Sequence, residues 1–108
     1  MSSDKREGYG MSYESRFKNE EIDELFKAIL ALETEEDCYR FFEDICTINE
    51  IHAISQRQHV ARLLYERKTY NEIEEVTKAS TATISRINKC LVYGADGYRR
   101  ILERIYTK

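Results

Sequence analysis

Residues 72–86 have the sequence EIEEVTKASTATISR, and this stretch decides the fold. Ser80 is a preferred type of helix N-cap, so a helix is predicted from Thr81 to about Leu91. A shorter helix is predicted before it, because Thr69-Tyr70-Asn71-Glu72 has the capping-box pattern, in which Thr and Glu bind each other's backbone N–H groups. The stretch therefore predicts two consecutive helices joined by a tight turn.

Apolar residues within this stretch have the spacing of a helix-turn-helix. Ile73 is placed to anchor the first helix, and the small Ala79 closes the turn. Ile84 and Ile87 are placed to hold the second helix to the rest of the protein. We predict a helix-turn-helix from about Thr69 to Leu91, with the outer face of its second helix free to enter a DNA groove.

Two residues depart from the common bacterial helix-turn-helix pattern. Glu74 stands where a small residue normally lets the two helices approach each other. Lys78 stands where glycine normally turns the chain. If the turn needs a positive φ angle there, Lys78 is expected to be strained.

The second helix offers side chains suited to the major groove. Its first turn carries short Ser, Thr and Ala residues, which let the backbone approach base edges, form hydrogen bonds and touch thymine methyl groups. Further along, arginine and lysine can meet phosphates or guanine. The predicted DNA-contacting residues are Asn71, Lys78, Ser80, Thr81, Ala82, Thr83, Ser85, Arg86, Asn88 and Lys89.

Composition favours one all-helical domain. The chain has 108 residues, no proline and four glycines, and it is rich in helix-forming side chains. Its net charge is −3, yet residues 78–108 hold seven basic and two acidic side chains, +5 in all, which leaves −8 on the rest. A basic carboxy-terminal third suits a protein that presents one face to phosphates.

Apolar periodicity and capping residues predict four further helices, at about 19–32, 35–46, 48–66 and 98–106. Thr34 and Asp96 are the expected caps of the second and last of these. Residues 1–18 are expected to form a mobile tail before a single domain, 19–108. The core residues expected from the third helix onward are Ile51, Ile54, Val60, Ala61, Leu64, Tyr70, Ile73, Val76, Ile84, Ile87, Leu91, Ile101, Leu102 and Ile105.

Other protein classes find little support in the sequence. No apolar run is long enough to span a membrane and no signal peptide is apparent, so a cytoplasmic protein is expected. The chain has three cysteines, Cys38, Cys46 and Cys90, and none of them forms a Cys-x-x-Cys motif with another. They are expected to be reduced and buried. His52 and His59 lie seven residues apart, too loose a pattern for a metal or acid–base site. We predict no enzyme, metal or cofactor.

Four segments together resemble the Trp repressor superfamily and, within it, the YerC/YecD-type proteins. They are YRFFEDICTINE (39–50), KTYNEIEE (68–75), ASTATISR (79–86) and YGADGY (93–98). The resemblance covers about residues 20–100. It implies a six-helix subunit in an interlocked homodimer, in which each helix-turn-helix contacts one half-site of a pseudo-palindromic operator. Half-sites of this kind lie about 34 Å apart.

The resemblance also implies a ligand site, held between an arginine of the long helix and the arginine after the Ala-Thr-Ile run. The matching residues are Arg57 and Arg86. The family has glycine at the next position, which leaves room for the indole of tryptophan, whereas this chain has Ile87. A branched side chain there would fill the space. We therefore expect DNA binding without a tryptophan corepressor, or under an unidentified small-molecule effector.

The alternative is a protein-interaction module. In this hypothesis the chain is a helical dimer whose helix-turn-helix no longer recognises a DNA sequence. The acidic first two thirds of the chain and the departures at Glu74 and Lys78 favour it.

Overall fold

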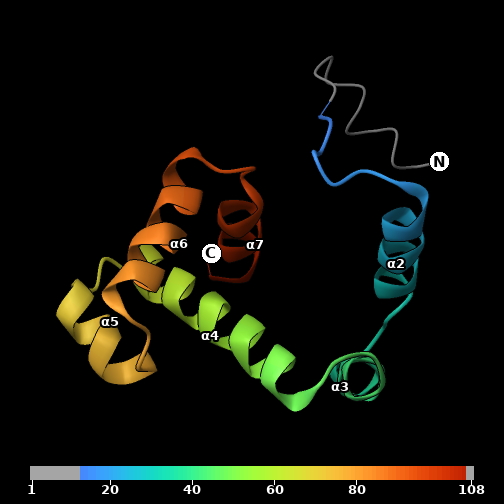
Figure 1. Cartoon of the computed structure of the whole chain (residues 1–108), viewed down its shortest axis with the longest axis horizontal. Coiled ribbons are helices and arrows are strands. Elements are labelled where there is room, and N and C mark those ends of the chain that lie inside the picture. Colours follow the sequence, from blue (N-terminus) through green and yellow to red (C-terminus); the bar gives the residue numbers. More distant parts are fainter. Residues whose placement is uncertain (1–12, 107–108) are drawn as a thin grey trace. The chain divides into compact units, whose positions relative to one another are not determined.

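The computed structural model describes residues 13–106, so most of the predicted tail and the last two residues lie outside the described part. That part contains helices and no strands, which confirms the all-α prediction. The helices are α2 (Glu20–Leu30), α3 (Glu35–Ile45), α4 (Ile48–Tyr65), α5 (Tyr70–Thr77), α6 (Thr81–Tyr93) and α7 (Gly97–Tyr106) (Figure 1). None of these helices has the length and apolarity that a membrane crossing needs.

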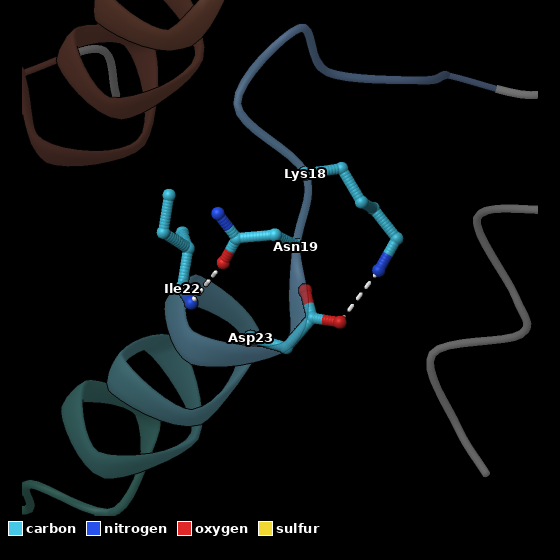
Figure 2. Close-up of polar contacts among 4 residues, drawn as sticks. All are labelled: Lys18, Asn19, Ile22 and Asp23. Atoms are coloured by element: carbon cyan, nitrogen blue, oxygen red, sulfur yellow. Dashed lines mark hydrogen bonds and ion pairs between the residues drawn. The ribbon is translucent and has the colours of Figure 1, made fainter.

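The chain divides into two compact units between Phe41 and Phe42, within α3. The first unit starts its helices with side-chain caps. The Asn19 side-chain oxygen accepts a hydrogen bond from the Ile22 backbone N–H at 2.8 Å, and Lys18 pairs with Asp23 at 2.6 Å (Figure 2). As predicted, Thr34 caps α3. Neither α2 nor α3 has a buried residue.

The second unit has α4 as its scaffold. Helices α5, α6 and α7 all contact α4, and α6 also contacts α5 and α7. In Figure 1 these three helices, coloured yellow to red, gather around the second half of the green α4. The buried side chains of the second unit form one core, which consists of Val60, Ala61, Leu63, Ile73, Ala79, Ile84, Ile87 and Leu102. Leu64 and Leu91, both predicted core residues, are partly buried against it.

Several apolar residues predicted to be buried are exposed in the structure. Ile54 is 44 % exposed and Val76 is 61 % exposed, and Tyr70, Ile101 and Ile105 are also exposed. The core instead includes Leu63, which the sequence analysis did not select. Periodicity identifies apolar positions, but which of them face the core depends on where the neighbouring helices cross α4.

Two further predictions are wrong. Cys38 and Cys90 are exposed, because they lie on helix faces outside the core, although all three cysteines are free thiols.

Asp96 was expected to cap α7, yet among the described residues its carboxylate accepts from side chains. It binds Arg99 Nε at 2.8 Å, which raises the pKa of Arg99. Asp96 has a φ of 75°, whereas an N-cap residue has an extended backbone conformation.

Candidate nucleic-acid interface

Helix α5 begins with a complete capping box. The Glu72 N–H donates to Thr69 Oγ1 at 3.1 Å, and the Thr69 N–H donates to Glu72 Oε1 at 2.8 Å. The backbone hydrogen bond from Thr69 stabilises the carboxylate and lowers the pKa of Glu72. The predicted start of the helix-turn-helix is thus formed by reciprocal backbone capping.

The turn between α5 and α6 is held by Thr77. Its hydroxyl donates to the Ile73 carbonyl at 2.8 Å and accepts from the Ala79 N–H at 3.1 Å. From α4, the Gln56 side chain donates to the Thr77 carbonyl at 3.0 Å. Ala79, the small residue predicted to close the turn, is buried. These bonds fix the turn both to itself and to the scaffold helix.

Lys78 adopts the left-handed backbone conformation in which strain is expected for a residue other than glycine. Its φ is 62° and its ψ is 15°, and its N–H donates to the Glu74 carbonyl at 2.9 Å as the C-cap of α5. Glycine adopts this conformation without the clash between Cβ and backbone that other residues suffer. Lys78 therefore occupies a backbone conformation that favours glycine.

Ser80 caps α6, as predicted. Its Oγ accepts from the Thr83 N–H at 3.1 Å, and its hydroxyl donates to Thr83 Oγ1, also at 3.1 Å. Ile84 and Ile87 are buried and anchor the helix. The inner side of α6 is therefore fixed against the core.

The opposite side of α6 is open to solvent. Ala82, Ser85, Arg86 and Lys89 are exposed and follow the i, i+3, i+4, i+7 spacing of one helix face. This face contains two cations and no carboxylate. Among the other predicted contact residues, Asn71, Lys78, Ser80 and Thr81 are exposed, and Thr83 and Asn88 are half-buried.

Thr81 has a partner that the sequence analysis missed. Its hydroxyl donates to Glu74 Oε2 at 3.2 Å, across the turn from α6 to α5. Glu74 is larger than the small residue that is common at this position, but its side chain is exposed and does not enter the space between the two helices. The two residues are seven positions apart and lie on different helices, so neither periodicity nor capping could have paired them.

The candidate ligand residues lie on the surface. Arg57 and Arg86 are both exposed, whereas Ile87, between α6 and the scaffold, is 3 % exposed. Tyr98 packs against the core, and the pKa of its hydroxyl is raised because burial outweighs the opposing effect of the nearby Arg57 charge. Among residues 13–106, no three His, Cys, Asp or Glu side chains converge as a metal site would require.

Comparisons with known proteins agree with this geometry. The family model described as Trp repressor protein matches residues 20–106. An uncharacterized protein of Bacillus subtilis strain 168, YerC, is 53 % identical over 90 residues, which cover 83 % of this chain and 86 % of YerC.

Two crystal structures are also similar. A TrpR-like protein from Eubacterium eligens is 53 % identical with a TM-score of 0.80, and the match covers 83 % of this chain and 93 % of that one. A candidate Trp repressor from Staphylococcus aureus is 47 % identical with a TM-score of 0.81, over 86 % and 93 % of the two chains. Identity and backbone similarity thus extend well beyond the helix-turn-helix.

Proposed function

Because this chain belongs to the Trp repressor family, whose members are DNA-binding regulators and not enzymes, we propose that it is a sequence-specific transcriptional repressor. In this proposal it acts as a homodimer on a pseudo-palindromic operator. Each subunit places α6 in the major groove of one half-site, with the two recognition helices about 34 Å apart.

The exposed face of α6 is the observation that carries the proposal. Ala82, Ser85, Arg86 and Lys89 share this face, while Ile84 and Ile87 on the other side hold the helix rigidly to the core. Short side chains let the backbone approach base edges, and the two cations can bind guanine or phosphates.

Exposed apolar side chains in the first unit support a homodimer. Phe26 and Leu30 on α2 and Tyr39 on α3 are large and mostly exposed. Phe26 and Leu30 lie four residues apart on one face of α2, and contiguous exposed apolar side chains mark interaction sites. A second copy of this chain is the occupant that two-fold operator symmetry requires.

The proposed repressor works without tryptophan. Binding of an indole between Arg57 and Arg86 would need free space beside α6, and Ile87 is packed into the core at that point. The two arginines remain available for DNA or for an effector of another shape. Regulation by an unidentified small molecule therefore remains the alternative to constitutive DNA binding.

Binding-site selection from a random duplex pool, with and without tryptophan, tests the proposal. We expect a pseudo-palindromic site to be enriched equally in both conditions. Affinity for that site should fall linearly in a plot of log affinity against log salt concentration, because DNA binding releases counterions. Sedimentation equilibrium should give the mass of a dimer.

A variant pair makes this experiment specific to α6. Lys89→Ala should weaken binding to all sequences and reduce the salt slope by about one. Lys27→Ala removes the same charge from α2 and should leave the slope unchanged. If no sequence is enriched and affinity does not depend on salt, the chain is an interaction module and the proposal is wrong.

A further inference from the structure

We propose that Glu74 determines base preference by fixing the hydrogen-bond polarity of Thr81. Held by Glu74, the Thr81 hydroxyl can only accept from DNA, and it therefore selects a base that offers a donor in the major groove. This inference rests on the proposed function, since it concerns the same interface.

The polarity follows from the contact itself. Thr81 Oγ1 lies 3.2 Å from Glu74 Oε2, and both side chains are exposed. An ionised carboxylate can only accept hydrogen bonds, so the threonine must donate its one hydroxyl proton. The oxygen of Thr81 keeps its lone pairs, whereas a free threonine could rotate to donate or accept.

Nothing else competes for the Glu74 carboxylate within the described residues. It forms no ion pair there, because the ion pairs of residues 13–106 join other side chains. The Lys78 N–H binds the Glu74 backbone carbonyl, which helps to hold the end of α5 beside the start of α6. The carboxylate therefore remains free to hold Thr81.

Donors in the major groove identify the favoured bases. Adenine offers its N6 amino group and cytosine its N4 amino group, whereas thymine O4 and guanine O6 are acceptors. An acceptor-only hydroxyl opposite thymine O4 or guanine O6 leaves both oxygens without a donor. Glu74 can itself accept from cytosine N4. The pair should therefore favour adenine or cytosine at the base nearest Thr81.

The negative charge of Glu74 has a second consequence. Close to the phosphate backbone, a carboxylate is repelled, so the residue should reduce affinity for every sequence. Glu74 thus combines weaker overall binding with stronger discrimination at one position. A residue that affected affinity alone would change binding to all sequences equally and leave the base preference unchanged.

The test uses the full-length protein and four operators that differ only at the selected base pair. For the wild type we expect the favoured bases to bind on the order of tenfold more tightly than the others. In Glu74→Ala that ratio should fall close to one, while overall affinity rises. Thr81→Val, which removes the hydroxyl but keeps the shape, should also lose the ratio.

Glu75→Ala is the matched control, because Glu75 is an exposed carboxylate on the same helix that does not contact Thr81. It should raise affinity while keeping the base preference. Circular dichroism should show that the variants remain folded, as expected for exposed positions. The inference is wrong if Glu74→Ala keeps the wild-type ratio, or if Glu75→Ala loses it as well. Wild-type binding without any sequence preference would instead refute the proposed function itself.

Discussion

Both units of the chain contain amphipathic helices, but the two units bury their apolar side chains very differently. In the second unit, Ile73, Ile84 and Leu102 are completely buried within one core. In the first, neither α2 nor the part of α3 up to Phe41 has a buried residue, and Leu30 is 84 % exposed. The helix-turn-helix thus has a core within one chain, whereas the first two helices lack one.

This difference shows what a regular apolar stripe can and cannot establish. Ile22, Leu25, Phe26, Ile29 and Leu30 form a more regular stripe than any in α4, yet α4 provides three of the core residues. Periodicity predicts a helix that needs to bury one face, and packing supplies most of the stability of such a helix. What covers that face is decided outside the helix.

The largest expected effect is a loss of stability when a core residue of the second unit is truncated. Ile84→Ala leaves a cavity in the core, and large-to-small changes at such positions lower the free energy of unfolding by about 2–5 kcal/mol. Urea unfolding followed by circular dichroism measures the loss. Leu30→Ala deletes as much apolar surface outside this core, so we expect it to weaken self-association instead.

Sedimentation equilibrium and melting at several protein concentrations distinguish the two variants. The melting temperature of a protein stabilised by association depends on its concentration. Leu30→Ala should weaken the dimer, while Ile84→Ala should retain it in whatever fraction remains folded. Unchanged self-association of Leu30→Ala would mean that the apolar face of α2 is not a dimer interface.

Local interactions explain which parts of the fold were predictable. Thr69 and Glu72 lie three residues apart, so their capping box could be predicted from the sequence, as could the N-cap Ser80. Residues that are close in sequence fix such features almost alone. For the same reason, the predicted ends of the helices agree closely with the structure.

Contacts between helices explain the rest. Leu63 is buried and Ile54 exposed because α5, α6 and α7 pack on the second half of α4, which no local pattern encodes. The bonds from Gln56 to Thr77 and from Thr81 to Glu74 likewise join residues on different helices. The exposed α6 face could be predicted, but the partner of Thr81 could not.

A smaller effect concerns the turn in the well-packed unit. Lys78→Gly should raise the free energy of unfolding by about 1 kcal/mol, because glycine relieves the left-handed conformation but loses more backbone entropy on folding. Thermal or urea unfolding measures the gain. Lys78→Ala is the control, since it removes the charge and keeps a Cβ at the same φ. If Lys78→Gly is less stable than Lys78→Ala, the conformation at Lys78 is unstrained and the prediction is wrong.

The smallest effect is a pH dependence at the start of α5. The lowered pKa of Glu72 means that folding favours its carboxylate, so this stabilisation is present above the ordinary value of 4.5 and disappears as pH falls through the lowered value. Glu72→Gln keeps an acceptor for the Thr69 N–H but has no charge to titrate. It should be less stable than the wild type near neutral pH, and the difference should close at acid pH.

Glu75→Gln removes a charge from the same helix without touching the capping box and is the control for this measurement. Melting temperatures of the three proteins across the acid range provide the comparison. A constant difference between Glu72→Gln and the wild type at every pH would assign the effect to hydrogen-bond geometry. A difference that closes only for Glu72→Gln would show that the helix-turn-helix is stabilised by a charged cap, in addition to the apolar core that α2 and α3 lack.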